Sequence, residues 1–420
     1  MNFLSTGEKI KRARIYKGVT LKELCKKDVS ISKMSCIEND KIKAEQWILE
    51  MVAERLDLDI QYLLFDDIME LESSIKNYES LDVFTENDFL AIKERLEYCL
   101  AKGYKDLAFK FIHILFEVYT KRKKFEGINE LISTYNELHE DDTDQKQVYY
   151  EDLAKYFLAK RNYSDAITYL NRAISHIVSY TISKNMDCYI KNNFLLAKAY
   201  YLTNDYNKCE EILKELLYLE DKIKSDEYIA LINGLMLTCR MKLNKDITAN
   251  LEKFDAYKHK EKITYCTIEL LIAENYFEQN NQDKALDIIL DIKEKVKSNN
   301  SYAYTELLLY MVEILLNNEK VDVAKEMSEE ALEISIKLDS QFLIERSYLY
   351  KARINRVNRS LIQWEMNMNL ATDILVRFAS VEEKRQRYIE MAEMYHIIGE
   401  TRETIKYLTL AMNLEKIISI

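Results

Sequence analysis

The chain contains no proline and only six glycines among its 420 residues. Proline interrupts helices and glycine permits the backbone conformations of many tight turns, so their scarcity argues against a structure of short strands and irregular loops. No apolar run approaches the roughly 18 residues that a membrane-spanning helix needs, and Met1 to Leu4 lead directly into a charged segment rather than a secretory signal. We therefore expect an all-α protein that is cytoplasmic and does not contact a membrane.

Close groups of metal-binding or catalytic residues are also missing. The seven cysteines are scattered, which is typical of reduced thiols that pack as small apolar side chains. The five histidines match no metal-ligand spacing, and the isolated glycines form no phosphate-binding loop. We expect no catalytic residue, no metal, no cofactor and no enzymatic activity.

Residues 20–38 carry the pattern of a helix-turn-helix. Thr20 and Glu23 form a capping box that starts one helix. Ser30 is placed to cap a second helix, which turns Met34 and Ile37 inward at helical spacing. The first half of that second helix is the part that meets base edges in such motifs. The pattern therefore predicts a DNA-contacting helix that begins after residue 30.

The flanking segments complete a five-helix bundle that ends near Leu64. A second capping box, Ser5 with Glu8, opens a helix that we expect to bury Ile10, Ala13 and Ile15. Further inward residues are predicted at Trp47, Ile48, Met51, Val52, Leu56, Leu58, Ile60, Leu63 and Leu64.

This segment resembles the Cro/repressor (XRE-type) DNA-binding domain. The similarity lies in Thr20-Leu21-Lys22-Glu23-Leu24, Ile31-Ser32-Lys33-Met34-Ser35 and Ile37-Glu38-Asn39 followed by Lys41. Departures are Asp28 and Asp40 where the family often has glycine, Leu21 and Ile31 where it often has glutamine, and Cys36 where a polar residue is common. A degenerate domain that has lost DNA binding is the alternative. The predicted DNA-binding residues are Arg12, Lys22, Ile31, Ser32, Lys33, Ser35, Cys36 and Lys41.

The charge distribution favours DNA binding. Residues 1–43 contain eleven lysines and arginines against five acids, a net charge of +6. Because the whole chain carries −11, the remaining residues carry −17. We call the basic amino-terminal segment the head and the acidic remainder of the chain the body. This distribution suits a head that neutralises DNA phosphates while the body stays away from the duplex. A chance asymmetry of solvated surface is the alternative.

A degenerate repeat follows the head. Each copy has a small or apolar anchor after a short polar turn, with further apolar residues four and seven positions later. Successive anchors are 38, 43, 40, 36, 39, 40 and 40 residues apart, somewhat longer than the period of about 34 in tetratricopeptide repeats. The pattern predicts a tetratricopeptide-like α-solenoid, with an irregular helical bundle as the alternative. The anchors are Ile128, Ala166, Cys209, Ala249, Ala285, Ala324, Trp364 and Thr404.

We divide the chain into a DNA-binding domain over 1–66, a helical linker over 67–102 and a repeat domain over 103–420 for peptide binding and dimerisation. Stacked repeats form a concave groove, where asparagine amides suit the backbone of an extended peptide. Such asparagines are also ordinary polar surface residues of helices. The candidate peptide-binding residues are Asn193, Tyr201, Asn233, Asn275 and Phe277.

Head and repeats together resemble the RRNPP family of peptide-sensing transcriptional regulators of Gram-positive bacteria, in particular the clostridial RstA-type branch. The resemblance implies a homodimer that binds a two-half-site DNA operator and a short signalling peptide, with outputs such as sporulation, virulence, competence and plasmid transfer. Alternatives are an interaction scaffold or response-regulator-binding protein with a vestigial head, a response-regulator phosphatase, and a repressor whose body only oligomerises.

Overall fold

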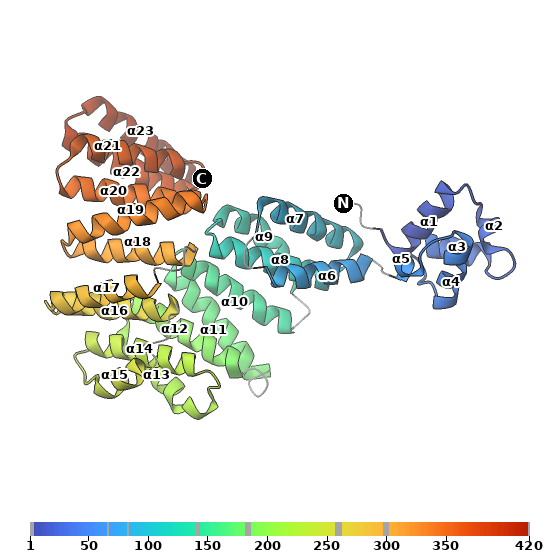
Figure 1. The fold of residues 1–420 in the computed structure, drawn as a ribbon, viewed down its shortest axis with the longest axis horizontal. Helices are drawn as coiled ribbons and strands as arrows, with labels where there is room; N and C mark the ends of the chain where they lie inside the picture. The colour runs from blue at the N-terminus through green and yellow to red at the C-terminus, as the bar shows by residue number, and fades with distance from the viewer. Residues whose placement is uncertain are drawn as a thin grey trace. The chain divides into compact units, whose positions relative to one another are not determined.

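The computed structural model describes residues 4–64, 67–81, 84–139, 143–180, 186–256, 263–296 and 302–418. Over these residues the chain is helical throughout and contains no strand, which confirms the all-α fold class (Figure 1). The chain divides into two compact units, considered separately below. Unit 1 comprises Met1–Val118 and Leu131–Gln145, and unit 2 comprises Tyr119–Glu130 and Lys146–Ile420. The predicted boundaries at residues 66 and 102 both fall inside unit 1, so the three-part division stays a prediction.

Unit 1 begins with the predicted five-helix bundle. Ile10, Leu24 and Met34 are fully buried at its centre. The helices of the amino-terminal part are α1 (Thr6–Tyr16), α2 (Leu21–Cys25), α3 (Ile31–Glu38), α4 (Gln46–Arg55), α5 (Ile60–Leu64), α6 (Asp67–Glu79), α7 (Glu86–Lys102), α8 (Lys105–Lys121) and α9 (Phe125–Leu138).

The predicted helix starts in the bundle are confirmed. The Thr20 and Ser5 side chains each accept a hydrogen bond from the backbone N–H three residues later, and Glu23 and Glu8 bond back to the capping residues. Ser30 caps α3 by accepting from the N–H of Lys33. Local capping chemistry therefore sets where all three helices begin.

Two predicted core residues of the bundle are on its surface. Ile15 is 60% exposed, because it follows Ile10 by five residues and so lies about 140° around the helix from it. Trp47 is 44% exposed, and its indole N–H donates to the Glu45 carboxylate at 2.6 Å. The hydrogen bond holds the indole in the first turn of α4, away from the core that contains Ile48.

Unit 2 is a series of antiparallel helix pairs (Figure 1). We call the two helices of each pair the first and the second helix. The first helices of neighbouring pairs also pack on each other: α14 on α16, α16 on α18 and α18 on α20. The tetratricopeptide-like solenoid is therefore confirmed. Its helices are α10 (Thr143–Ala159), α11 (Tyr163–Tyr180), α12 (Met186–Leu202), α13 (Tyr206–Tyr218), α14 (Asp226–Lys242), α15 (Thr248–Asp255), α16 (Ile263–Glu278), α17 (Gln282–Val296), α18 (Tyr302–Asn317), α19 (Val321–Lys337), α20 (Gln341–Val357), α21 (Leu361–Leu375), α22 (Val381–Ile398) and α23 (Thr401–Ile418), with a 3₁₀ turn at Glu220–Lys222.

The turns between paired helices share one geometry. In each turn, the residue five positions before the anchor has a positive φ. The backbone N–H of the following residue then donates to the carbonyl five residues earlier in the chain, as in a Schellman cap. Only one of these residues is a glycine, so the scarcity of glycine does not prevent tight left-handed turns. The residues are Lys123, Arg161, Asn204, Asn244, Asn280, Glu319, Arg359 and Gly399.

The repeat anchors are buried as predicted at Ile128, Ala166 and Cys209, and also at Ala285, Ala324 and Trp364. The prediction that Ala249 is the buried anchor of the fourth repeat is wrong. It is exposed, and Asn250 and Phe254 are buried in its place. The turn 243–247 before α15 is longer than the turn 203–205 before α13, which shifts the buried face.

Candidate DNA-contacting and peptide-binding surfaces

The outward side of α3 is open at its start. Ile31 is 48% exposed and Ser32 is exposed, whereas Lys33, Ser35 and Cys36 are half-buried. The other predicted DNA-binding residues, Arg12, Lys22 and Lys41, are exposed on α1, on α2 and just after α3. The basic candidates thus lie around the helix that the motif assigns to DNA.

A buried ion pair fixes α3 against α1. The Arg14 guanidinium donates to both carboxylate oxygens of Glu38, at 2.6 and 2.8 Å, and also to the carbonyl of Val19. Glu38 is 3% exposed. Burial opposes the charge of Arg14, but the hydrogen bond to Glu38 outweighs it and raises the pKa of Arg14. A bidentate pair of this kind sets the helix angle as well as adding stability.

Lys33 is engaged within the bundle. Its ammonium group lies 2.7 Å from Glu45 Oε1 and 5.9 Å from the centre of the Trp47 ring. The hydrogen bonds from Lys33 and from the Trp47 indole lower the pKa of Glu45. A phosphate that binds Lys33 must therefore compete with an exposed carboxylate.

Asp40 accounts for one departure from the resembled family. Its φ is +54°, the left-handed region that favours glycine, and its carboxylate accepts from the Ser5 hydroxyl at 2.5 Å. Asp28, the other departure, instead pairs with Arg55. Both acids thus contribute contacts that glycine lacks.

We call the inner face of unit 2 the set of first-helix side chains that lie eleven and fourteen residues before the anchors from Ala166 onward, together with Tyr201 and Asn275. Two pairs of neighbouring first helices on this face are joined by the same tyrosine–glutamate hydrogen bond. Tyr310 of α18 donates to Glu274 of α16 at 2.9 Å, and Tyr350 of α20 donates to Glu313 of α18 at 2.9 Å. Burial raises the pKa of Glu274. Sequence reasoning missed these pairs, although counting back from the anchors reveals them.

Two predicted peptide-binding residues meet on the inner face. The Asn275 amide donates to the Tyr201 hydroxyl at 3.2 Å and to the carbonyl of Leu271. Tyr201 belongs to α12 and Asn275 to α16, so the contact joins two helices between which α14 stands in the order of the repeats. Tyr201 is 6% exposed and Asn275 is 2% exposed. Burial raises the pKa of Tyr201. Phe277, the second aromatic candidate, is 5% exposed and belongs to the apolar core around α16 and α18. Tyr201 itself belongs to the neighbouring apolar core around α12 and α14.

Asn193 and Asn233 have other partners. Each amide donates to the carbonyl four residues earlier in its own helix. Asn233 is 1% exposed, and its oxygen accepts from Asn250 of α15 at 3.0 Å. The residue therefore faces the second helix of its own repeat and links α14 to α15.

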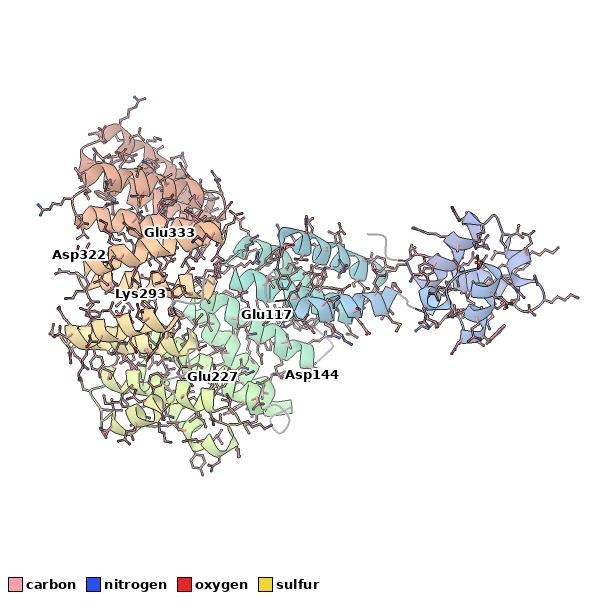
Figure 2. The ribbon with its side chains drawn as sticks, in the orientation of Figure 1. Glu117, Asp144, Glu227, Lys293, Asp322 and Glu333 are labelled. Atoms are coloured by element: carbon pink, nitrogen blue, oxygen red, sulfur yellow. The ribbon has the colours of Figure 1, made fainter. Side chains whose placement is uncertain are left out.

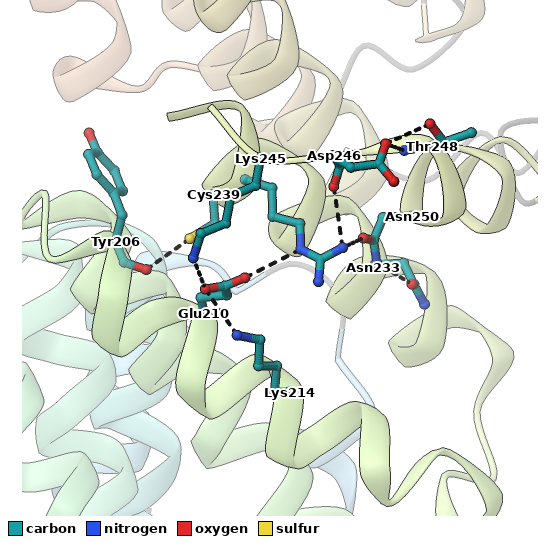
Figure 3. Close-up of polar contacts among 10 residues, drawn as sticks. Tyr206, Glu210, Lys214, Asn233, Cys239, Lys245, Asp246, Thr248 and Asn250 are labelled. Carbon is teal, nitrogen blue, oxygen red and sulfur yellow. Dashed lines mark hydrogen bonds and ion pairs between the residues drawn. The ribbon is translucent and has the colours of Figure 1, made fainter. Parts of the chain in front are cut away.

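This asparagine pair extends into a charged network (Figure 3). Asn250 accepts from Arg240 at 2.9 Å, and Arg240 lies 3.4 Å from the buried carboxylate of Glu210. Lys245 and Lys214 lie 2.6 and 3.1 Å from the same carboxylate. Burial opposes ionisation, but the two lysines outweigh it and lower the pKa of Glu210. The network fastens α13, α14 and α15 together.

Ion pairs join segments of unit 2 that are distant in sequence. Lys123, in the turn before α9, lies 2.6 Å from Glu306 of α18 and 4.5 Å from the centre of the Phe342 ring. Arg161, in the turn after α10, lies 3.8 Å from Glu313.

The second helices carry charged side chains, among them Lys293 of α17 and Glu333 of α19 (Figure 2).

No protein-family model and no curated protein matches the sequence. Among solved structures, the chain is similar to the apo form of the quorum sensor NprR from B. thuringiensis, with 12% identity, 83% of this chain and 100% of that chain covered, and a TM-score of 0.44. A Rap protein complexed with Competence and Sporulation Factor gives 12% identity, coverage of 83% and 96%, and a TM-score of 0.48. PlcR from Bacillus thuringiensis, in complex with the peptide PapR7 and DNA, gives 15% identity, coverage of 96% and 99%, and a TM-score of 0.27.

In the part of the chain that the structure describes, no helix combines the length and apolar character that crossing a bilayer demands.

Proposed function

We propose that this chain is a dimeric DNA-binding transcriptional regulator whose operator binding is controlled by a short peptide on the inner face of unit 2. The observation that carries the DNA-binding part is the bundle itself. Its α3 begins at a confirmed cap, exposes its first residues and lies among basic side chains in a segment with a net charge of +6. These are the features of a recognition helix.

The inner face supports the peptide part of the proposal. Tyr201 and Asn275 lie side by side. Asn275 donates its amide N–H groups to Tyr201 and to the carbonyl of Leu271, so its oxygen can accept from a peptide N–H and the Tyr201 hydroxyl can donate to a peptide carbonyl. Glu274 and Glu313 add carboxylates on the same face. We propose Tyr201 and Asn275 as peptide-contacting residues because they bond to each other across two repeats. Asn193, Asn233 and Phe277 stay predictions as peptide contacts.

A binding assay with the full-length protein tests the DNA part. Fluorescence anisotropy with fragments from upstream of the chain's own gene should show specific binding that weakens steeply with salt. Ser35→Ala should reduce affinity for the specific fragment more than for random DNA, since base contacts carry specificity. Absence of binding at every salt concentration up to the physiological level would contradict the proposal.

A protein-interaction scaffold with a vestigial head is the second candidate. The observation that favours it is the engagement of Lys33 by Glu45, which removes one cation from the DNA-contacting face. The same anisotropy assay separates the two, because the scaffold binds neither fragment.

For the peptide part, peptides encoded beside the gene should change DNA affinity, and Tyr201→Phe with Asn275→Ala should abolish that change.

A further inference from the structure

The inner face of unit 2 carries an ordered set of charges. The residues six positions before the left-handed turn residues are equivalent in every first helix, including α14, where the anchor itself is shifted. They are cationic in α10 and α12, neutral in α14, anionic in α16 and α18, cationic in α20 and anionic again at Glu393 in α22. Because equivalent positions of stacked repeats lie in a row, the face is polarised along the solenoid. The residues are Lys155, Lys198, Thr238, Glu274, Glu313, Arg353 and Glu393.

Most charges in this row have a partner. Glu274 and Glu313 each accept from a tyrosine that lies fourteen residues before the next anchor. Arg353 lies over the Tyr350 ring, and Lys155 lies 3.6 Å from a carboxylate oxygen of its own helix. These contacts compensate the charges within the fold.

Lys198 of α12 differs. The tyrosine position of the next repeat is here occupied by Leu235, which is fully buried and apolar. Among the described residues, no hydrogen bond or ion pair reaches the Lys198 ammonium group. The side chain is half-buried, and burial lowers its pKa. An enclosed ammonium group without a compensating anion is unfavourable, so an anionic ligand at this place would remove a cost that the free protein carries.

The neighbours of Lys198 indicate what kind of anion. Tyr201 follows by three residues, so both side chains lie on one side of α12. Tyr201 in turn meets Asn275, whose amide oxygen can accept from a peptide N–H. A lone lysine supplies one positive charge, which matches a carboxylate, whereas phosphate sites gather several cations or backbone amides.

We propose that Lys198 binds a carboxylate group of the peptide, with Tyr201 and Asn275 contacting the peptide backbone beside it. This inference rests on the proposed peptide-binding function. It orients the ligand, with the negatively charged group against α12 and any basic group toward Glu274 and Glu313. The carboxylate comes either from the peptide's C-terminus or from an aspartate or glutamate side chain.

The test uses the full chain and three synthetic heptapeptide pools: free C-terminal acids, C-terminal amides, and free acids without aspartate or glutamate. Peptides retained by the protein are separated by size exclusion and counted by mass spectrometry. Lys198→Met keeps the length of the side chain and removes the charge. Lys191→Met is the matched control, because Lys191 is an exposed lysine on the same helix. Both variants should keep the wild-type melting temperature, since neither removes an internal ion pair.

We expect the wild type and Lys191→Met to retain carboxylate-bearing peptides about ten- to hundredfold better than peptides without the group, the usual effect of a hydrogen bond to a charged partner. Lys198→Met should lose that preference. Retention of acids that lack aspartate and glutamate identifies the C-terminus as the source, and retention of acidic amides identifies a side chain.

Two results overturn the inference in distinguishable ways. If the wild type retains peptides with no preference for a carboxylate, or if Lys198→Met keeps the preference, the role of Lys198 is wrong and peptide binding stands. If the wild type retains no peptide from any pool, the proposed peptide function fails and the role of Lys198 fails with it.

Discussion

Lys33 lies on the predicted DNA-contacting side of α3, but its ammonium group is bonded to Glu45. We predict that Glu45→Gln increases DNA affinity about three- to tenfold at low salt, because it removes a competing carboxylate and a negative charge near the duplex. Fluorescence anisotropy over a salt series measures this. Glu50→Gln removes an exposed acid of α4, the helix that Glu45 precedes, and should change affinity less. Equal gains in both variants would contradict a specific effect of Glu45.

Glu210 is 4% exposed and bonded to three cations. We predict that Glu210→Gln lowers the free energy of unfolding by about 2 kcal/mol, below the usual cost of breaking a buried ion pair because its cations stay partly exposed. Denaturant unfolding measures the loss. Glu211→Gln, an exposed neighbour, should leave stability within about 0.5 kcal/mol.

The same carboxylate predicts a pH dependence. The folded-state pKa of Glu210 lies below its ordinary value of 4.5, so its ionised form stabilises the fold above that pH. This contribution disappears as the pH falls through the folded-state pKa. The melting temperature of the wild type should therefore fall more steeply below pH 4.5 than that of Glu210→Gln. Parallel curves would show that another acid controls the acid transition.

At the scale of elements, the sequence predicts helix starts better than buried faces. The caps at Ser5, Thr20 and Ser30 depend on neighbouring residues only, so they follow from local pattern. The exposure of Trp47 depends on a hydrogen bond to Glu45, and that of Ala249 on the length of the preceding turn. Neither exposure can be predicted from the spacing of apolar residues in the sequence. The inner-face rows also need the register of the whole repeat, which is fixed only when the left-handed turns are located.

Those left-handed turns give a prediction of their own. Glu319 has a φ of +59°, which costs a residue with a Cβ roughly 1 kcal/mol. Glu319→Gly should therefore raise stability by about 0.5 kcal/mol after the added entropy of the unfolded chain is subtracted, and Glu319→Val should lower it by more than about 1 kcal/mol. Thermal unfolding distinguishes the three proteins. If glycine and valine have the same effect, the turn does not hold this conformation in solution.

At the scale of the whole molecule, the proposed control by a peptide requires that unit 2 adopt more than one shape. Two ion pairs, Lys123 with Glu306 and Arg161 with Glu313, join the first turns of unit 2 to α18, and we call this contact the closure of unit 2. Lys123 and Glu306 are partly exposed, so their ion pair contributes at most about 1 kcal/mol. A closure of this strength is an equilibrium that a ligand shifts by its differential affinity for the closed form.

Charge reversal tests that equilibrium. Glu306→Lys places two cations together and should open unit 2, which raises the radius of gyration in small-angle scattering and increases proteolysis near residue 123. The swap Lys123→Glu with Glu306→Lys restores an ion pair of opposite orientation and should restore the wild-type radius, although the carboxylate introduced at position 123 cannot replace the cation over Phe342. Unchanged scattering in the single variant would mean that helix packing alone holds the closure, and peptide control would then have to act through another contact.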